Sequence, residues 1–237
     1  MKRTRTAGKR IRVAIDGPAG VGKTTTARGL AEALDLLYVD TGAMYRALAV
    51  AAMENGLSPD DADAATALAG RTRVVLGSEG GRPTVALDGR DVTEAIRSPQ
   101  ASDGASRISV HPGVRRELVR WQQDLARTRG VVMEGRDIGT VVLPDAEAKV
   151  FLTASVAERA RRRCRELQAK GQPASLEAVR LDIAERDARD RSREASPLVP
   201  APDAVVIDCT ALDAPSQLAA VRRVVDAVLA MRDGAFE

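Results

Sequence analysis

Aromatic residues are scarce in this sequence. The chain has 237 residues, of which one is Trp, two are Tyr and two are Phe. A core of ordinary size must therefore be built from Ala, Val, Leu and Ile. Proteins that bind single-stranded nucleic acid use aromatic side chains for base stacking, so this scarcity argues against such a surface.

Cysteine and histidine are also rare. The two cysteines, Cys164 and Cys209, lie far apart and follow no ligand spacing, which argues against a disulfide framework and against a zinc site. His111 is the single histidine. It precedes Pro112 at the start of an expected helix, and we interpret it as structural. The sequence therefore offers no histidine nucleophile.

Long hydrophobic runs are missing as well. No segment approaches the roughly 20 consecutive apolar residues that a transmembrane helix needs. Residues 1–10 are basic and lead into a strand-like segment without the apolar region of a signal peptide, so we expect a cytoplasmic protein. The net charge of +3 includes five positive charges in this tail, so the remainder carries −2. We interpret the tail as disordered and solvated, with a nucleic-acid-binding arm as the alternative.

Short apolar segments alternate with helical patterns along the rest of the chain. The expected strands lie at residues 10–16, 36–40, 130–137, 148–154 and 203–210. The expected helices lie at residues 22–34, 42–56, 98–108 and 112–130, from residue 155 onward, and at residues 175–189 and 214–231. This alternation predicts an α/β fold, with a five-stranded parallel sheet flanked by helices and right-handed crossovers.

Three segments carry signatures of local structure. Residues 71–92 contain short β-type runs separated by Glu-Gly-Gly and Asp-Gly, which predicts a small antiparallel β insert. Ser58 with Asp61 predicts a capping box at a helix start, and Ser155 with Glu158 predicts another.

The segment from Gly17 to Thr24, GPAGVGKT, matches the pattern G-x-x-x-x-G-K-[ST] between an expected strand and an expected helix. Its glycines allow several backbone N–H groups to point inward, and the helix N-terminus adds partial positive charge. Lys23 would lie against the β- and γ-phosphates of a nucleoside triphosphate, and the Thr24 hydroxyl could ligate Mg²⁺. We therefore expect this loop to bind ATP.

Four further motifs follow the order and spacing of bacterial cytidylate kinases. They are DTGAMYR (40–46), EGRDIGTVV (134–142), ERDARDRSR (185–193) and PLVPAPDA (197–204). Together with the loop, they make the chain similar to this family of nucleoside monophosphate kinases among the P-loop NTPases. The family pattern often has Asp in place of Glu134 and Ser in place of Thr41, and both departures keep the chemical function. The resemblance implies phosphoryl transfer from ATP to CMP or dCMP, with Mg²⁺ as cofactor.

The resemblance also implies a division of the chain. Residues 11–40, 111–156 and 194–237 would form the P-loop core. Residues 41–110 would bind the nucleoside monophosphate and contain the β insert at about 71–92, and residues 157–193 would form an arginine-rich lid. We expect both excursions to close over the nucleotides, because water competes as an acceptor. The family implies a monomer, with no membrane or nucleic-acid partner.

The acceptor residues are assigned by the resemblance and supported by their chemistry. Arg46 and Arg115 would grip the monophosphate, since a guanidinium binds phosphate oxygens in a bidentate fork. Asp137 would accept from the exocyclic amine of cytosine, and Arg136 would donate to the ring nitrogen. Uracil reverses both polarities and would be rejected. Resemblance alone adds two further CMP contacts, Thr41 and Ser106.

The charged run at residues 185–193 is of a kind that usually forms a solvated helix face. Arg186, Asp190 and Arg193, however, share one helical face, which in the family closes over the sugar and phosphates. Asp190 would accept from ribose hydroxyls, and the two arginines would neutralise charge near the transferring group. The residues expected to face solvent are Asp187, Arg189 and Arg191.

Arg159 and Arg163 lie one turn apart in the expected lid and could reach the ATP phosphates, whereas Arg161 and Arg165 are expected to face solvent. The full set of expected ATP-binding residues is Gly17, Pro18, Ala19, Gly20, Val21, Gly22, Lys23, Thr24, Thr25, Arg159 and Arg163. The expected catalytic residues are Lys23, Arg136, Arg186 and Arg193.

Two acids follow expected strands near the loop. Glu134 would approach Mg²⁺ through water, which makes Thr24 and Glu134 the expected metal-site residues. Asp16 is either a weaker candidate for the same role or a capping acid beside the loop.

Two other functions stay open from the sequence. Another P-loop kinase, acting on UMP, AMP or a metabolite such as shikimate, would share the loop, although the β insert and the Gly-Arg-Asp triplet argue against it. A nucleotide-dependent nucleic-acid binder is motivated by the Lys and Arg content and by the tail. The charge of −2 outside the tail and the few aromatics argue against it.

Overall fold

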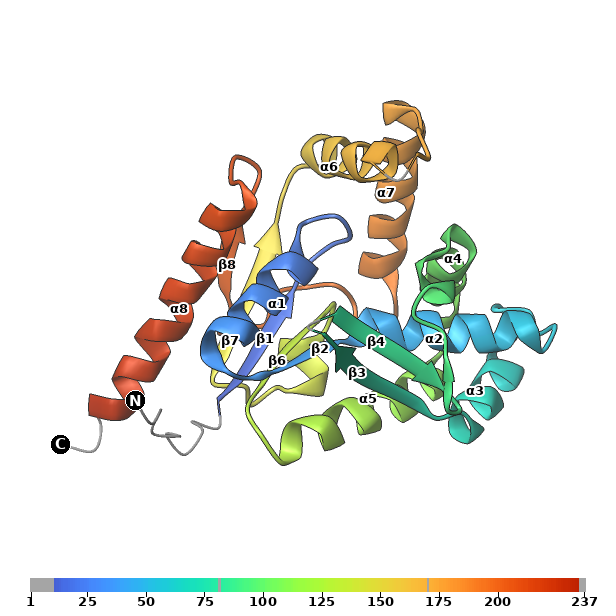
Figure 1. Cartoon of the computed structure of the whole chain (residues 1–237), viewed down its shortest axis with the longest axis horizontal. Helices are drawn as coiled ribbons and strands as arrows, with labels where there is room; N and C mark the ends of the chain where they lie inside the picture. The colour runs from blue at the N-terminus through green and yellow to red at the C-terminus, as the bar shows by residue number, and fades with distance from the viewer. Residues whose placement is uncertain (1–10, 81, 170, 235–237) are drawn as a thin grey trace. The chain divides into compact units, whose positions relative to one another are not determined.

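The structure is a computed structural model that describes residues 11–80, 82–169 and 171–234 (Figure 1). The basic tail at residues 1–10, which we expect to be disordered, lies outside the described residues. The chain divides into two compact units. The first comprises residues up to Tyr38 and from Ala126 onward, and the second comprises Val39–Leu125.

The first unit is built on a five-stranded sheet. Its strands are β1 (Arg12–Asp16), β2 (Leu37–Asp40), β6 (Val131–Gly135), β7 (Ala148–Thr153) and β8 (Val205–Asp208), in the order β2-β6-β1-β7-β8. Strand β1 pairs in parallel with both β6 and β7, and β7 pairs in parallel with β8. The central strand β1 is almost wholly buried, as its uninterrupted apolar run predicts. The predicted parallel sheet of five strands is confirmed.

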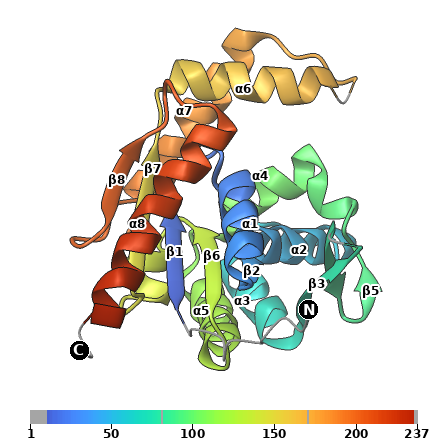
Figure 2. The same cartoon turned by 60° about the vertical axis from the view of Figure 1, so that its left-hand side comes forward.

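Helices α1 (Lys23–Leu34) and α8 (Ala214–Gly234) pack side by side against this sheet (Figure 2). The core between them is aliphatic, with Ile15, Leu30 and Leu152 fully buried, so the scarcity of aromatics is met by branched side chains.

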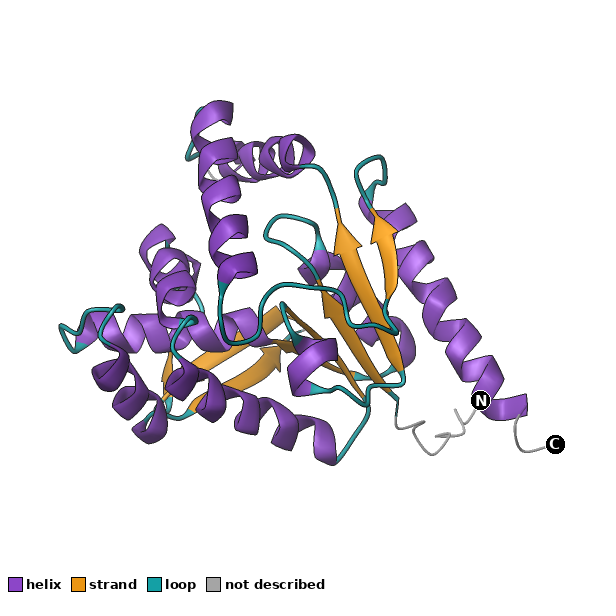
Figure 3. Cartoon of the chain, turned by 180° about the vertical axis from the view of Figure 1, so that it is seen from behind, coloured by secondary structure: helices purple, strands orange, loops and turns teal. Residues whose placement is uncertain are grey.

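Two further helices, α6 (Val156–Ala169) and α7 (Leu176–Ser192), pack against each other beyond the arrowheads of the strands (Figure 3). A short π-helix follows β6 at Ile138–Val142. Among the described residues, no helix is both long and apolar enough to span a membrane.

The second unit is mostly helical. Its helices are α2 (Thr41–Glu54), α3 (Ala62–Arg71), the 3₁₀ turn η1 (Ala95–Arg97), α4 (Pro99–Ile108) and most of α5 (Pro112–Arg127). The three-stranded antiparallel sheet of β3 (Val74–Glu79), β4 (Arg82–Leu87) and β5 (Arg90–Asp91) is the predicted insert. Asp88 has a positive φ of 50°, as expected for a tight Asp-Gly turn. The apolar core of this unit includes Leu48, Leu68 and Leu118.

Helix caps were predicted with mixed success. The Ser155 hydroxyl accepts from the amide of Glu158, as the predicted capping box requires, but the amide of Ser155 donates to the hydroxyl of Thr210 rather than to Glu158. The cap is therefore confirmed and the reciprocal half of the box is wrong. The capping box of Ser58 with Asp61 is wrong, because α3 begins one turn later. Asp61 itself is the N-cap and accepts from the amide of Ala64. An aspartate caps as well as a serine does, so composition could not decide between the two.

Candidate active site

The loop between β1 and α1 has a backbone that requires glycine. Gly17, Gly20 and Gly22 have φ values of 149°, 74° and 94°. A Cβ on Gly17 would lie 2.2 Å from the carbonyl oxygen of Leu152 on β7, so no other residue fits. Helix α1 begins at Lys23, directly after the loop, and its N-terminus supplies unpaired amides there.

Lys23 is buried within its own loop. Its Nζ donates to the carbonyl oxygens of Gly17 and Pro18, each at 2.8 Å. Burial, followed by the nearby guanidinium of Arg136, lowers the pKa of Lys23 to about 7, against the raising effect of the Glu134 carboxylate. A buried ammonium among other cations is a poor resting arrangement that a polyanion would relieve.

Asp16 is a capping acid, but not for the phosphate loop. Its two carboxylate oxygens accept from the amides of Ile138 and Gly139, at 2.8 and 2.7 Å. Burial raises the pKa of Asp16 to about 6, against the lowering effect of these two hydrogen bonds. Asp16 therefore fixes the turn after β6, which carries Arg136 and Asp137.

Glu134 is held by a residue that the sequence did not single out. It lies buried on β6, and one carboxylate oxygen accepts from the hydroxyl of Tyr38 at 2.6 Å. The hydroxyls of Thr24 and Thr25 lie on exposed residues at the start of α1. A carboxylate and a threonine hydroxyl are hard oxygen donors of the kind Mg²⁺ prefers. The residues present therefore fit the expected magnesium ion.

Arg136, which follows β6, meets α7 at Asp190. Its Nε donates to Asp190 Oδ2 at 2.8 Å, and Arg193 Nη2 lies 3.4 Å from Asp190 Oδ1. Burial raises the pKa of Asp190, but the cations Arg136 and Arg193 outweigh it, so the net direction is down. Arg186 is half-buried on the same helix. Arg193 is the C-cap of α7 rather than part of its helical face, because the helix ends at Ser192.

Asp137 is buried at the start of the π-helix. Its main-chain carbonyl accepts from the amides of Val141 and Val142, at 2.9 and 3.2 Å. The backbone of the proposed base reader is thus fixed by the turn that Asp16 also caps.

Arg159 is among the most buried large side chains of the described residues, at 1% exposure. Its guanidinium donates to both carboxylate oxygens of Asp187, at 2.9 and 2.6 Å, and to the carbonyl oxygen of Ala19 in the loop at 3.1 Å. The expectation that Asp187 faces solvent is therefore wrong. A direct contact between Arg159 and ATP phosphates stays a prediction.

The other arginines of α6 differ in their surroundings. Arg163 pairs with Glu166 at 3.2 Å on a partly exposed surface, and its predicted contact with ATP is untested. Arg161 and Arg165 are exposed, as predicted. Arg162 was not predicted. Its guanidinium donates to the carbonyl oxygens of Cys209 and Leu212, at 2.6 and 3.0 Å, and to that of Val21 in the loop at 3.4 Å.

In the second unit, Arg46 is oriented by Asp40. The two form an ion pair of 2.9 Å, while the other oxygen of Asp40 caps α2 by accepting from Ala43. A Cβ on Gly42 would lie 3.0 Å from Arg46 Nη1 and 3.1 Å from Asp40 Oδ1, so this glycine leaves room for the pair. Thr41 is buried at the first position of α2.

Arg115 and Ser106 are both buried in the second unit. Arg115 donates to the carbonyl oxygen of Ser109 at 3.2 Å, and its guanidinium lies 5.8 Å from the ring centroid of Tyr45. Within the described part of the chain, the Ser106 hydroxyl has no hydrogen-bond partner. A buried polar atom of this kind fits a ligand-binding role. His111 contacts the carbonyl oxygen of Pro59 at 2.8 Å, in line with its structural interpretation.

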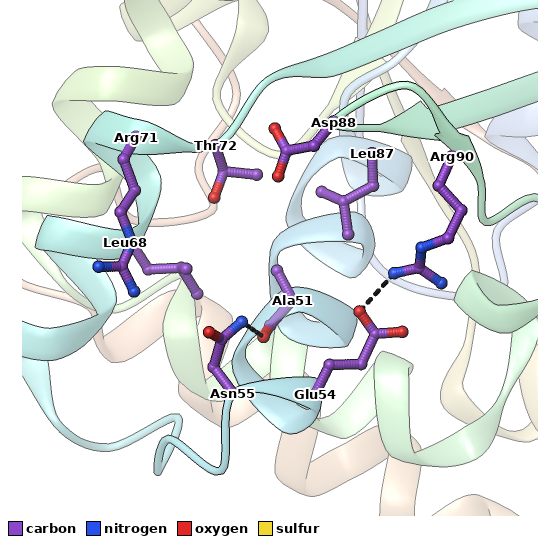
Figure 4. Close-up of a pocket in the computed structure, with 9 residues that line it drawn as sticks. All are labelled: Ala51, Glu54, Asn55, Leu68, Arg71, Thr72, Leu87, Asp88 and Arg90. Atoms are coloured by element: carbon purple, nitrogen blue, oxygen red, sulfur yellow. Dashed lines mark hydrogen bonds and ion pairs between the residues drawn. The ribbon is translucent and has the colours of Figure 1, made fainter.

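A cavity of about 540 Å³ lies elsewhere in the second unit, between α2, α3 and the β insert (Figure 4). Glu54 and Arg90 form an ion pair of 2.5 Å at its wall, and Asn55 donates to the carbonyl oxygen of Ala51. None of the predicted site residues lines this cavity. It is therefore not the candidate active site.

Comparison with known families gives one match over most of the chain. The family model described as cytidylate kinase matches residues 13–230. A cytidylate kinase of Solibacter usitatus (strain Ellin6076) is 49% identical over 209 residues, which cover 87% of this chain and 88% of that protein. A cytidylate kinase of Pelotomaculum thermopropionicum is 53% identical over 201 residues, covering 84% of this chain and 89% of that protein.

Some relatives are longer. The bifunctional pantoate ligase/cytidylate kinase of Synechococcus sp. (strain JA-3-3Ab) is 53% identical over 204 residues, and the matched region covers 85% of this chain but 38% of that protein. This chain therefore corresponds to about two fifths of such relatives. Among solved structures, a gluconokinase from Sinorhizobium meliloti 1021 superposes with a TM-score of 0.44 at 15% identity over 96% of each chain, which is too distant to bear on function.

Proposed function

Because this chain belongs to the cytidylate kinase family, we propose that it transfers the γ-phosphoryl group of ATP to CMP or dCMP. The products are ADP with CDP or dCDP. A phosphate oxygen of the acceptor forms the new P–O bond as the bond to the ADP oxygen breaks, in line and without a covalent enzyme intermediate.

The observation that carries this proposal is the gathering of cations around the loop lysine. Lys23 is buried at the loop, and the guanidinium groups of Arg136 and Arg186 are close enough to lower its pKa. These cations repel one another when no anion is bound. The same arrangement can stabilise the negative charge that spreads over a phosphoryl group during its transfer.

On the donor side, the loop from Gly17 to Gly22, Lys23 and the amides at the start of α1 would hold the triphosphate. The hydroxyl of Thr24 and the carboxylate of Glu134 would hold Mg²⁺, directly or through water. The ion would neutralise negative charge on the bound triphosphate. Thr25, Arg159 and Arg163 complete the proposed donor set.

On the acceptor side, Asp137 and Arg136 would read the cytosine edge, as an acceptor and a donor matched to its amine and ring nitrogen. Asp190 would accept from the ribose, with Arg186 and Arg193 beside it. The second unit would contribute phosphate and base contacts through Thr41, Arg46, Ser106 and Arg115. The buried, unsatisfied hydroxyl of Ser106 supports its part in this set.

Closure would protect the reaction from water. We propose that the acceptor-binding segment, residues 41–110, and the lid, residues 157–193, move when both nucleotides bind. Trp121 fluorescence and hydrogen exchange across both segments, measured with CMP and an inert ATP analogue, test this. Unchanged signals in both segments would contradict closure. We propose that the protein acts as a monomer in the cytoplasm. Sedimentation with and without nucleotides measures the oligomeric state.

A substrate panel tests the acceptor. Purified protein is given Mg²⁺·ATP and CMP, dCMP, UMP, AMP or shikimate, and ADP release is followed by a coupled assay. We expect turnover with CMP and dCMP to exceed that with the other acceptors by at least about 10²-fold. Uracil reverses the donor and acceptor positions of the cytosine edge, adenine is a larger purine base, and shikimate has no base edge for Asp137 and Arg136 to bind. Preferential use of UMP, AMP or shikimate would replace the proposed acceptor. If ADP were released at the same rate with and without each of the five acceptors, the proposed kinase activity would be contradicted.

A further inference from the structure

Arg159 links three segments that are distant in sequence. Its Nε donates to the carbonyl oxygen of Ala154 at 3.0 Å, just before α6. Its Nη1 donates to Ala19 of the phosphate loop, and Nη1 and Nη2 together hold both oxygens of Asp187 on α7. One side chain therefore ties the loop to both helices of the lid pair.

The loop side of this link is tightly packed. A Cβ on Gly20 would lie 3.5 Å from Arg159 Cβ and 3.6 Å from its carbonyl oxygen, so the arginine backbone and stem run directly along the loop. The ion pair itself is shielded from water, since the side chains of Arg159 and Asp187 are 2% and 4% exposed. Its geometry is bidentate, which fixes direction as well as distance. A shift of the loop at Ala19 would therefore displace Arg159 and, with it, Asp187.

The other side of the link carries the acceptor-facing groups. Asp187 follows Arg186 directly on α7 and lies three residues before Asp190. Asp190 in turn pairs with Arg136 at 2.8 Å. Rotation or translation of α7 at Asp187 would therefore move the residues proposed to bind the ribose and phosphates of the acceptor.

We infer that the Arg159–Asp187 pair is a positioning link that transmits occupancy of the phosphate loop to α7, so that ATP binding orders the acceptor-facing residues of α7. The inference rests on the proposed function only in that the loop binds ATP. Asp187 touches neither nucleotide in this account and acts through Arg159. Binding of ATP and of the acceptor should then be positively coupled, as any such link requires.

Hydrogen exchange with an inert ATP analogue and Mg²⁺, without acceptor, reads the link directly. In the wild-type protein we expect slower exchange both in the loop, residues 17–24, and in residues 186–193 of α7. Protection of the loop without protection of α7 would overturn the inference with no variant needed. No protection anywhere would overturn the proposed function, and this inference with it.

Variants then separate positioning from packing. Asp187→Asn leaves a buried guanidinium without its counter-charge and is expected to destabilise the fold, so it is a weak test alone. The double variant R159M/D187L replaces the pair with apolar side chains and keeps α6 and α7 packed. Because Arg159 is also a proposed ATP contact, the analogue is added at a concentration that saturates the loop of the variant. At that saturation we expect the variant to be folded, to show protection of the loop, and to lose the analogue-induced protection of α7. Asp182→Asn, an exposed acid on the same helix, is the matched control and should behave as wild type.

The affinity for CMP gives an independent reading. In the wild type, the analogue should tighten CMP binding by about 5-fold or more, and in R159M/D187L this factor should fall to about 1. A double variant that keeps both the protection of α7 and the tightening would show that the pair is mere packing and would overturn the inference. If the wild type binds the analogue but does not bind CMP, the proposal that CMP is the acceptor is wrong. The hydrogen-exchange experiment still tests the Arg159–Asp187 link in that case.

Discussion

Asp190 on α7 accepts a 2.8 Å charge-assisted hydrogen bond from Arg136, which follows β6 and is 54 residues away in sequence. Arg193 approaches the other oxygen of the same carboxylate at 3.4 Å. One acid thus balances two of the cations proposed to act on the transferring group. Its removal would leave Arg136, Arg193 and Arg186 to repel one another.

The first prediction follows from this pairing. Asp190→Asn should lower kcat/KM for CMP by about 10²-fold, because both the ribose contact and the orientation of Arg136 are lost. KM for ATP should change far less. Steady-state kinetics with each substrate varied in turn measure this, with Asp182→Asn as the control on the same helix. Equal losses for both nucleotides would contradict the acceptor assignment of Asp190.

The second prediction concerns base selection. Asp137→Asn replaces an acceptor with a group that can also donate, so CMP turnover should fall by about 10²-fold or more and the gap between CMP and UMP should narrow. Relative kcat/KM values for the two monophosphates measure it. Unaltered CMP turnover would mean that Asp137 does not read the base.

The third prediction concerns Tyr38. Tyr38→Phe removes the 2.6 Å hydrogen bond to Glu134, which helps to orient the carboxylate of this proposed metal-site residue. The Mg²⁺ concentration for half-maximal activity should rise about 10-fold, in the range seen when groups that orient metal ligands are removed. A magnesium titration at saturating ATP and CMP measures this. Tyr45→Phe, a tyrosine in the other unit, is the control. An unchanged magnesium titration would mean that Glu134 does not contribute to magnesium binding.

The fourth prediction links Lys23 to stability. Its pKa is about 7 in the folded protein, against the ordinary lysine value of 10.5, so the unfolded chain binds more protons between these limits and stability rises with pH across that window. Lys23→Met should therefore be more stable than wild type at pH 6.5 without nucleotide, and this advantage should shrink by pH 9.5. Its activity should fall by about 10³-fold or more.

Urea unfolding at the two pH values measures the first part. Arg28→Met, which removes an exposed cation from the same helix, should leave the pH dependence unchanged. A Lys23→Met protein that is less stable than wild type at pH 6.5 would show that the lysine stabilises the empty loop.

The features predicted correctly from the sequence are those set by neighbouring residues. The glycines between Gly17 and Gly22 predict a loop whose backbone needs positive φ values. The Asp-Gly pair at Asp88 predicts a tight hairpin turn, because such turns match the twist of the strands. The alternation of apolar and helical segments was enough to predict the parallel sheet. Each of these depends on a few consecutive residues, so each can be predicted from local sequence.

The pairs that connect distant segments were missed. Asp187 was expected to face solvent because it lies off the helical face that Arg186 shares with Asp190, but Arg159, 28 residues away, buries it. Tyr38 and Glu134 are 96 residues apart, and nothing in either strand indicates the other. Asp16 caps a turn 122 residues later rather than the adjacent loop. Such contacts depend on how the strands are ordered, which local patterns do not encode.

The most direct measurement is the stoichiometry of products when ATP, Mg²⁺ and cytidine monophosphate are mixed with the purified protein. The proposed phosphoryl transfer predicts one CDP formed for every ADP released, and negligible ADP without the monophosphate. ADP released at the same rate with and without CMP, or ADP without matching CDP, would contradict it.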